Sequence, residues 1–547
     1  MVAPVERSPS EPSADPPQRP RGRIRSILVI GMLLVVLVVV GRQLDTWSGA
    51  PSAVKDCAIH AVQTPGRDLP PRATQVAPTY PAGTTQRGGT VNDASCLNRT
   101  QVYGVVRPRS AADVRDTLAF AATHDLTVSV AGTNHAMGGQ AMRPGALILD
   151  MSAMDSVHVD PQQRTATVGA GARWREVLEA VHPEGLSVAT MPSIDVLSVG
   201  GTVSVNAHGL DFRRGSLSSS IRSLRLMTAD GTVHDIGPDR SPALFRAAVG
   251  GYGLLGVILD VELELVDSEV YRFTSHLIDT AEFPRYFTEN VAGDDDMRMS
   301  YTHLSTSPGS LLQEAIVYTY ERVPAGEPVP DLHARDSDRI GRLVLNLGRT
   351  GGVGARLKWT LQRDLLPHAR DCLTARNQAL RDAEACMVPR NQAMYESLGL
   401  LGNRLPQYTD VLHEYFLPHD QIVPFLDDLR LELRRHNAVL LNASIRSVHQ
   451  EDIALDYAQG ERFSVVLYLS QSVSANGNHD MQDLTQRLVS QALARGGTFY
   501  LPYQQHHTGD QVRQAYPQFD AFIATKRQHD PHLLFRNSIW DRYAEQQ

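Results

Sequence analysis

Apolar residues recur every three or four positions after Ser110, as they do on one face of a helix. Ser110 and Asp113 have the spacing of a capping box, with Asp in place of the usual Glu or Gln. Short apolar runs bounded by turn residues then predict strands at 127–130, 147–149 and 165–168, followed by a helix at 174–181. Because these elements do not alternate regularly, the pattern predicts an α+β fold and disfavours a barrel.

A second clear pattern lies at residues 438–448, which read AVLLNASIRSV. Alternation with a period of two is typical of a strand and separates its residues into two faces. One face carries Leu441, Ala443 and Ile445, and the other carries Asn442, Ser444 and Arg446. A polar row with one arginine in an otherwise apolar strand predicts a lined pocket. The alternative is an edge-strand arginine that lies in solvent.

The N-terminal part of the chain differs in composition from the rest. Residues 1–26 are rich in Pro, Ser and Arg, which predicts a disordered tail. Residues 27–41 hold an apolar run that is short for a membrane span, so a cleaved signal peptide is the alternative to a single transmembrane anchor. We favour the anchor, because the nearest small-residue motif, residues 48–50, lies well past the run. Residues 42–96 hold many prolines, which predicts a stalk and a folded body that begins near residue 97.

Charge and cysteine usage indicate where the body lies. Four arginines at 19–25 lie just before the apolar run and Arg42 follows it, so the tail is expected in the cytoplasm and the body on the other side of the membrane. The four cysteines, Cys57, Cys96, Cys372 and Cys386, form no C-x-x-C pair. Two disulfides in an oxidising compartment or four buried thiols both account for them.

Length and charge limit the classes of function. The 547 residues are too many for one core and suit two large domains with extensions. Apolar residues make up 42% of the chain and charged residues 20%, as in an ordinary globular protein. The formal charge of −8 gives no general attraction to phosphate backbones, so nucleic acid is not an expected partner.

Three glycine-bearing stretches carry the main chemical signal. They are GTNHAMGG at 132–139, VGGTVSVNAHG at 199–209 and GGYGLLG at 250–256. Glycine lets backbone N–H groups approach a pyrophosphate, so three such loops can line one extended cofactor. The third stretch contains a formal G-x-G-x-x-G, but a predicted helix precedes it and a predicted strand follows it. A dinucleotide-binding fingerprint needs the reverse order, so a Rossmann domain is disfavoured.

These stretches in this order resemble the FAD-binding half of the flavoproteins grouped with vanillyl-alcohol oxidase, whose domain is called PCMH-type. Residues 135–151 are most similar to cytokinin dehydrogenases, and the layout also suits alditol and aldonolactone oxidases. The resemblance implies an FAD-binding domain of two α+β subdomains at 97–270 and a substrate domain with an antiparallel sheet at 271–500. It also implies a C-terminal segment at 501–547 that returns to the FAD-binding domain.

The resemblance also implies which residues contact FAD. The first stretch supplies Gly132, Thr133, Asn134, His135, Gly138 and Gly139. The second supplies Gly200, Gly201, Thr202, Asn206, His208 and Gly209, and the rest of the chain supplies Gly256, Val257, Ile258 and Asn537. His135 takes the position of the histidine that is bonded to the flavin 8α-methyl group in related enzymes, but Ala136 replaces the usual serine. A covalent bond through His135 and non-covalent contact therefore both stay open.

The strand at 438–448 looks like the Glu-x-Arg strand of alditol and lactone oxidases, with Arg446 as the arginine and Ser444 in place of the glutamate. An arginine at this place faces flavin N1 and C2=O and stabilises the negative charge that develops there. Residues 500–507 resemble the Tyr-Leu-Pro segment of cytokinin dehydrogenases. The candidate catalytic residues are Arg446, Ser444, Tyr503 and His506; further polar candidates are His208, Glu414, Tyr415, His507 and Asp195.

The sequence thus predicts an FAD-linked oxidase or dehydrogenase that acts on a CH–OH or similar carbon of a small substrate. Electrons are expected to pass to oxygen or to a membrane carrier, and the membrane is expected to contact the N-terminal helix. No metal site is predicted, because His506 and His507 have no third ligand at a useful spacing. The absent glutamate keeps one alternative open, a catalytically retired flavoprotein that serves as a scaffold or binding module.

Overall fold

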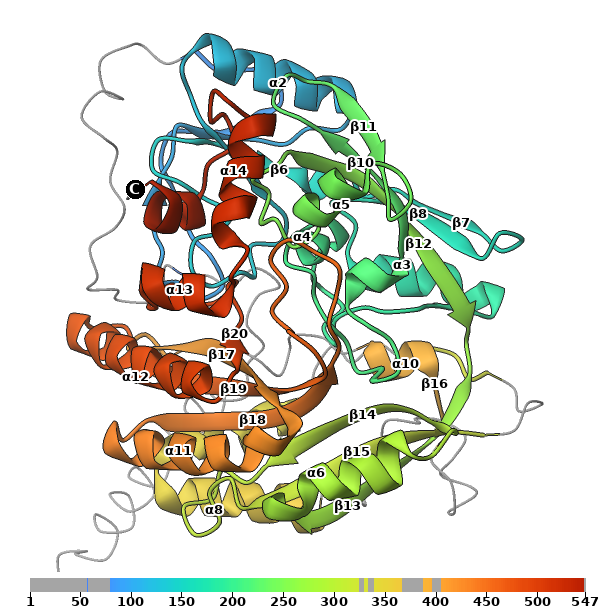
Figure 1. Ribbon diagram of the computed structural model, residues 1–547, viewed down its shortest axis with the longest axis vertical. Coiled ribbons are helices and arrows are strands. Elements are labelled where there is room, and N and C mark those ends of the chain that lie inside the picture. The colour runs from blue at the N-terminus through green and yellow to red at the C-terminus, as the bar shows by residue number, and fades with distance from the viewer. Residues whose placement is uncertain are drawn as a thin grey trace, which may run out of the picture.

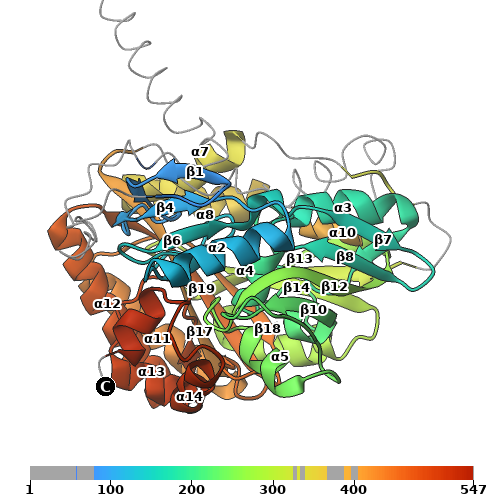
Figure 2. The same cartoon turned by 90° about the horizontal axis from the view of Figure 1, so that it is seen from above.

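The computed structural model describes residues 57, 79–323, 329–332, 339–365, 387–395 and 405–545. Helices and strands occur in mixed order along the chain, so the predicted α+β class is confirmed. Figure 1 shows the N-terminal half, coloured blue to green, above a large sheet that belongs to the later half of the chain. The last helices, in red, lie along one side of both parts (Figures 1 and 2).

The first sheet has the order β1-β4-β6-β5, with the last three strands parallel. Its strands are β1 (Thr84–Arg87), β4 (Gly104–Val106), β5 (Val128–Ala131) and β6 (Leu147–Asp150). Helix α2 (Ala111–Thr123) connects β4 to β5, and the Ser110 side chain caps it by accepting a hydrogen bond from the Asp113 N–H. The apolar face of α2 buries Val114 and Leu118 against this sheet, as the periodicity predicts. A two-stranded sheet, β2 (Thr90–Val91) with β3 (Thr100–Gln101), lies beside it in the chain.

The second sheet is antiparallel and has the order β11-β10-β12-β8-β7, with β9 paired to the end of β12. Its strands are β7 (Val157–Asp160), β8 (Thr165–Gly169), β9 (Leu186–Val188), β10 (Ile221–Met227), β11 (Val233–Ile236) and β12 (Val257–Asp267). The helices of this part are α3 (Trp174–Val181), α4 (Val199–Ser204) and α5 (Pro242–Ala248). The G-x-G-x-x-G lies between α5 and β12, so the helix precedes it and the strand follows it, as the sequence indicated.

The third sheet has eight strands in the order β16-β13-β15-β14-β18-β19-β17-β20, and every pairing in it is antiparallel. The strands are β13 (Val270–Asp279), β14 (Met297–Leu304), β15 (Glu314–Arg322), β16 (Met387–Pro389), β17 (Tyr408–Pro418), β18 (Val439–Val448), β19 (Arg462–Ser472) and β20 (Thr498–Phe499). The associated helices are α6 (Phe283–Tyr286), α7 (Arg339–Leu347), α8 (Gly352–Thr360), α10 (Arg390–Met394), α11 (Ile422–Arg435) and α12 (Ala475–Ala494). The expected antiparallel sheet is therefore confirmed.

The two faces of this sheet have different neighbours, which follows from the alternation along β17. Tyr415 packs on Phe425 of α11, with 5.4 Å between the ring centroids, and His413 lies beside Thr485 of α12. The next residues along the strand must point to the opposite face. Glu414 and Phe416 therefore point away from α11 and α12, and Glu414 contacts His208 of the N-terminal half.

The chain returns to the first sheet near its C-terminus, after α13 (Gly509–Ala515) and α14 (Phe519–His529). The Val128 N–H donates to the Leu534 carbonyl at 2.7 Å, and the Arg536 N–H donates to the Val128 carbonyl at 3.0 Å. These backbone bonds place residues 534–536 along the free edge of β5, with an isolated bridge between Val128 and Phe535. The C-terminal segment therefore covers an edge that would otherwise expose unpaired backbone groups.

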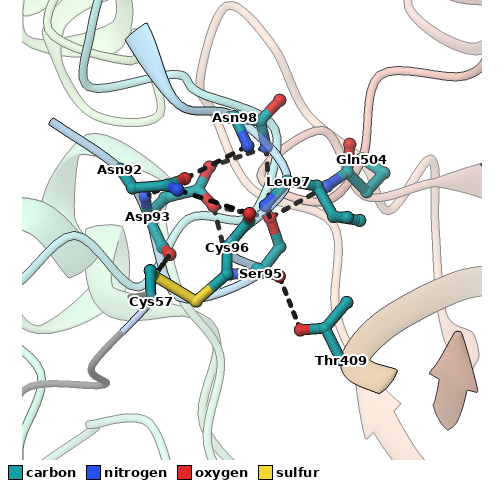
Figure 3. The surroundings of a disulfide bond; sticks show 9 residues. All are labelled: Cys57, Asn92, Asp93, Ser95, Cys96, Leu97, Asn98, Thr409 and Gln504. Carbon is teal, nitrogen blue, oxygen red and sulfur yellow. Dashed lines mark hydrogen bonds between the residues drawn. A yellow bond between two sulfur atoms is a disulfide. The ribbon is translucent and has the colours of Figure 1, made fainter. Parts of the chain in front are cut away.

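The prediction of a stalk up to residue 96 is wrong for its last part. β1 pairs with β4 inside the first sheet, and Asp93 and Ser95 are buried. A disulfide joins Cys57 to Cys96, and Figure 3 shows its surroundings. The prediction failed because it rested on local proline content, whereas the residues that this segment contacts lie elsewhere in the sequence.

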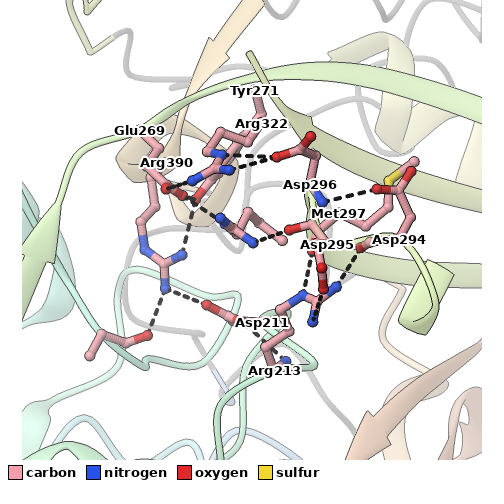
Figure 4. A network of polar contacts seen from close by, with 12 residues as sticks. Asp211, Arg213, Glu269, Tyr271, Asp294, Asp295, Asp296, Met297, Arg322 and Arg390 are labelled. Carbon is pink, nitrogen blue, oxygen red and sulfur yellow. Dashed lines mark hydrogen bonds and ion pairs between the residues drawn. The ribbon is translucent and has the colours of Figure 1, made fainter. Parts of the chain in front are cut away.

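A network of charged residues links the two halves (Figure 4). The buried Arg390 of α10 donates to the Asp211 carboxylate at 2.8 Å and to the Ala189 carbonyl at 2.7 Å, both in the N-terminal half. It also donates to the Tyr271 hydroxyl of β13 at 3.0 Å. Since a buried guanidinium must have its hydrogen bonds satisfied, these contacts fix the third sheet against the N-terminal half.

Two predictions concern residues outside the described part of the chain. The proposed anchor at 27–41 and the cysteines Cys372 and Cys386 all lie there. Within the described residues, every helix is too short or too polar to cross a membrane.

Candidate functional site

The three glycine-bearing stretches lie together in the structure. Gly132 approaches the second stretch so closely that a Cβ added to it would lie 2.0 Å from the Ser198 Oγ. The Ser198 N–H donates to the Thr133 hydroxyl at 3.3 Å, which joins the same two loops. The third stretch contacts the second one in turn. The Gly250 N–H donates to the Val203 carbonyl, and the Tyr252 N–H donates to the Ser204 carbonyl at 2.8 Å. Residues that are about 120 positions apart in the sequence thus form one group of loops.

The loops have conformations and polar groups that suit an elongated polar ligand. Asn134 and Asn206 adopt positive φ angles of 54° and 49°, and Gly253 adopts 71°. Such angles turn backbone N–H groups out of regular pairing. Among the residues that the structure describes, the buried Asn134 Oδ1, Asn206 Nδ2 and His208 Nδ1 lack a hydrogen-bond partner. Buried polar atoms are rarely left this way, so a bound ligand with hydrogen-bonding groups fits these loops.

Several residues that were predicted to contact FAD stabilise the conformation of the glycine loops. The Thr202 hydroxyl accepts from the Trp174 indole N–H at 3.0 Å, which turns it into the core. The Asn537 amide donates to the Tyr252 carbonyl at 2.8 Å and thereby holds the third loop. Gly200, Gly209 and Gly256 each pack against a backbone carbonyl that a Cβ would overlap, and Val257 and Ile258 are buried in β12. Their roles in FAD contact stay predictions, but their roles in shaping the loops are visible.

The first loop is fixed at its end by residues from other parts of the chain. The Gly139 N–H donates to the Asp93 carboxylate at 2.8 Å, and the Gly138 carbonyl accepts from the Ser538 hydroxyl at 3.1 Å. A Cβ on Gly138 would lie 2.4 Å from the Tyr503 carbonyl oxygen. His135, between these contacts and Gly132, is partly exposed. The loop that carries His135 therefore lies directly against the segment that carries Tyr503.

Glu414 of β17 is the centre of a buried polar cluster. Its carboxylate accepts from His208 Nε2 at 2.6 Å, from the Tyr503 hydroxyl at 3.1 Å and from the Ser464 hydroxyl. Burial opposes ionisation of Glu414, but the attraction of His208 and the hydrogen bonds from His208 and Ser464 outweigh it and lower its pKa. Burial and the charge of Glu414 in turn raise the pKa of Tyr503 well above its usual range. The cluster thus pairs an ionised carboxylate with a protonated phenol.

Arg446 lies on the same sheet face as Glu414. It pairs with Ser464 across β18 and β19, and Ser444 pairs with Val466, which is opposite Glu414. Directly opposed residues point to the same face, so Ser444, Arg446 and Glu414 share it. The Arg446 guanidinium donates to the Ser193 hydroxyl of the N-terminal half at 2.8 Å. The polar row of this strand therefore faces the N-terminal half, which excludes the alternative of an arginine in solvent.

The remaining polar candidates lie elsewhere. His507 is buried and its Nδ1 is 2.5 Å from the Tyr543 hydroxyl, while Tyr415 faces α11. Burial and the charge of Arg542 lower the pKa of His506 to about 4, so this buried imidazole is neutral near pH 7. Asp195 is fully buried and accepts from the Arg175 guanidinium at 3.0 Å, which gives it a structural ion pair. His506 stays a predicted catalytic residue that the observed contacts do not connect to Glu414.

Comparison with known proteins identifies these loops. Residues 102–237 match the family model described as FAD binding domain. This part of the chain is therefore an FAD-binding domain. The matched residues include the first two glycine stretches, and FAD is the cofactor that such a domain binds. The two α+β subdomains that the resemblance implied stay a prediction, for which the first and second sheets with their helices are the candidates.

Three relatives illustrate the similarity. Decaprenylphosphoryl-beta-D-ribose oxidase of Mycolicibacterium smegmatis is 32% identical over 180 residues, which are 32% of this chain and 38% of the relative. Cytokinin dehydrogenase 2 of Arabidopsis thaliana is 33% identical over 165 residues, 30% of this chain and 33% of the relative. Alditol oxidase of a Streptomyces species is 35% identical over 123 residues, 22% of this chain and 29% of the relative. The chain thus spans less than half the length of each of these relatives.

Sequence reasoning missed two members of the site. Ser464 donates to Glu414, and Ser193 accepts from Arg446, but neither was among the predicted site residues. The signal for Ser193 was its place in the sequence, six residues before the second glycine stretch. Ser464 had no such signal, because only the pairing of β19 with β17 and β18 brings it to the cluster.

Proposed function

We propose that this protein is an FAD-dependent oxidoreductase that removes a hydride from a CH–OH or similar carbon of a small-molecule substrate. The observation that carries the proposal is the buried Glu414 carboxylate, which gathers Tyr503 and His208 on the sheet face turned toward the FAD-binding domain. The names of the relatives support the reaction class, because they are oxidases and dehydrogenases. Their substrates differ from one another, so the relatives do not select a single substrate for this chain.

Oxidation of an alcohol carbon needs a group that accepts the hydroxyl proton. The Tyr503 hydroxyl donates its own proton to Glu414, so its oxygen lone pairs remain able to accept a hydrogen bond from a substrate hydroxyl. We expect the substrate proton to move to Tyr503 as the Tyr503 proton moves to Glu414. The high pKa of Tyr503 agrees with a phenol that relays a proton and does not lose it. His208 holds the carboxylate in place for this transfer.

FAD, when bound, supplies the two-electron acceptor for the departing hydride. Arg446 contributes a fixed positive charge on the same sheet face, and we expect it to stabilise the negative charge that builds up as the cofactor is reduced. His135 is proposed to hold the flavin, covalently or by direct contact. Ser444 is proposed to contact the substrate, because it precedes Arg446 by two residues on the same face. Electrons are proposed to pass on to oxygen or to a membrane carrier.

The test is anaerobic reduction of the purified, FAD-loaded protein by a panel of alcohols, sugars, lactones and amines. Loss of the visible flavin absorbance with at least one CH–OH donor is the expected result. The same panel applied to Glu414→Gln should give a much slower loss with that donor. A protein that binds FAD but is reduced by none of these compounds would favour the retired flavoprotein.

We further propose that residues 27–41 anchor the protein in a membrane, with the body outside the cytoplasm. The arginines before the apolar run support this orientation. The disulfide between Cys57 and Cys96 supports it independently, because structural disulfides persist mainly in oxidising compartments. Protease added to intact cells should digest the body. A body that is protected until the membrane is opened would contradict the proposal.

A further inference from the structure

The segment 92–98, which reads NDASCLN, contains Cys96 of the disulfide and contacts Thr409 and Gln504 (Figure 3). We infer that Asp93 and its neighbours form a clamp that positions the cofactor loop 134–139, and that the Cys57–Cys96 disulfide holds this clamp closed. This inference rests on the proposed role of that loop in holding FAD. The clamp consists of residues 92–98.

The Asp93 carboxylate is fully surrounded by donors. Its Oδ1 accepts from the Ser95 N–H at 3.0 Å and from the Ser95 hydroxyl at 2.6 Å. Its Oδ2 accepts from the Gly139 N–H at 2.8 Å and from the Asn98 amide at 2.9 Å. The Ser95 and Asn98 contacts shape the clamp itself, whereas the Gly139 contact reaches 46 residues along the chain to the cofactor loop. One buried carboxylate therefore couples the two segments.

Two further hydrogen bonds join the clamp to the same loop. The Ala94 N–H donates to the Asn134 carbonyl at 2.9 Å, next to His135. The Asn98 amide donates to the Met137 carbonyl at 2.7 Å. Together with the Asp93 contact, these bonds hold the loop at its start, middle and end. A loop held at three points has little freedom to change the position of His135.

The clamp also contacts the segments that carry the polar cluster. The Thr409 hydroxyl of β17 donates to the Ser95 carbonyl at 2.5 Å, and the Gln504 amide donates to the Ser95 hydroxyl at 3.0 Å. Thr409 lies on the strand of Glu414, and Gln504 follows Tyr503 directly. Ser95 is completely buried. The clamp is thus a point at which the cofactor loop and the proton-relay residues share one set of contacts.

The disulfide ties the clamp to a residue that is distant from it in the sequence. Cys57 is 39 positions away from Cys96, and its Sγ lies 3.6 Å from the Asp93 carbonyl oxygen. Cys96 adopts a positive φ of 60°, a strained conformation for a residue with a Cβ. The bond keeps this turn closed while Asp93 makes its contacts. Opening the bond removes one of the constraints that maintain the turn.

Reduction of this bond by a dithiol is chemically balanced. The two sulfurs of the reagent transfer two electrons to Cys57 and Cys96 and become a cyclic disulfide, and two protons end on the cysteine thiols. The reagent is the reductant, so no reaction of the bound cofactor is needed. We expect the reduced protein to keep its sheets but to lose order in the clamp and in the cofactor loop.

The first test compares Asp93→Asn with Asp230→Asn. Asp230 is a matched control, because it accepts the N–H and the hydroxyl of Thr232, two residues on, just as Asp93 accepts those of Ser95. Its turn lies at the tip of the β10–β11 hairpin. Hydrogen exchange of the cofactor-free proteins should accelerate about tenfold or more in peptides that cover 134–142 for Asp93→Asn, and remain unchanged there for the control.

The second readout is the flavin that each cofactor-free protein takes up when mixed with FAD and retains after gel filtration, which should fall about tenfold for Asp93→Asn and stay unchanged for the control. The third is dithiol treatment of the unmodified protein, which should reproduce both effects even if the variant does not fold. Exchange that rises equally throughout the chain would overturn the inference, since it shows general destabilisation. Unchanged loop exchange, or faster loop exchange with full flavin retention, would overturn it as well. In those cases, substrate-dependent flavin reduction by the unmodified protein shows whether the proposed function stands.

Discussion

Removal of the Tyr503 hydroxyl tests the proposed proton relay while the other residues of the site stay in place. Tyr503→Phe deletes the hydroxyl that donates to Glu414 at 3.1 Å and keeps the ring. Glu414 retains His208 at 2.6 Å and the Ser464 hydroxyl as donors, so its charge stays compensated. A hydrogen bond to a charged group contributes about 1.5–3 kcal/mol. Because two donors remain and Tyr503 is half-buried, we expect a loss at the lower end, about 1.5 kcal/mol in the free energy of unfolding.

The effect on the reaction should be larger than the effect on stability. A positioned acid or base accelerates a reaction by about 10²–10⁴, which corresponds to about 2.7–5.4 kcal/mol in the barrier. The rate of flavin reduction by a CH–OH donor, measured by rapid mixing without oxygen, should therefore fall by about 10²–10⁴ in Tyr503→Phe. FAD binding should be preserved, because the backbone contact with the cofactor loop does not involve the hydroxyl.

Tyr500→Phe is the matched control in the same segment. The Tyr500 hydroxyl donates to the Val205 carbonyl at 2.8 Å, and its ring lies 5.7 Å from that of Tyr503. This variant loses a buried hydrogen bond of similar length but leaves the Glu414 contact in place, so its rate of flavin reduction should stay within about threefold of the parent. Equal rates of flavin reduction in the two variants would refute the relay.

Four further outcomes are expected. Arg446→Ala should slow flavin reduction by about 10²–10³ with FAD still bound, the scale for loss of one charge-stabilising donor, as measured by rapid mixing. The pKa of Glu414 lies below its usual value of 4.5, so the stabilisation that its ionised form gives is complete above that pH and is lost as the pH falls through the lowered folded value. Urea unfolding at about pH 6 and about pH 3 should show a smaller loss of stability in Glu414→Gln than in the parent. Acid precipitation should leave yellow colour in the pellet if His135 is bonded to FAD, and His135→Ala should then release the flavin; unchanged flavin content, affinity and spectrum in this variant would remove His135 from the site. Gly138→Ala places a Cβ 2.4 Å from the Tyr503 carbonyl oxygen, so we expect about 1–3 kcal/mol of destabilisation with weaker FAD retention, and thermal unfolding with flavin content measures both.

Much of the fold was predictable where the signal is local. The helix α2 begins after Ser110, and α3 spans Trp174–Val181, as the apolar periodicity and the capping residues indicated. The alternation at 438–448 predicted both the strand β18 and the face that carries Ser444 and Arg446. Local patterns succeed here because the side chains that decide each element lie within one or two turns of each other.

The start of the body and the relay depended on contacts that no local pattern contains. Residues 84–96 were predicted as stalk because they follow a proline-rich stretch and hold many small polar residues, whereas the pairing of β1 with β4 leaves no such local pattern. Asp93 gave no signal, since its chemistry arises from Gly139 and from the surrounding burial.

The sequence by itself determined the glycine loops, the α+β class and the polar face of β18, because each depends on the order and spacing of neighbouring residues. Only the tertiary structure decided that Glu414 meets His208 and Tyr503, which lie 206 and 89 positions away. The strand order β18-β19-β17 and the packing of the third sheet against the FAD-binding domain bring these residues together in space. The free energy that fixes such an arrangement comes from burial and hydrogen bonding summed over the whole molecule, and no short segment of the sequence contains it.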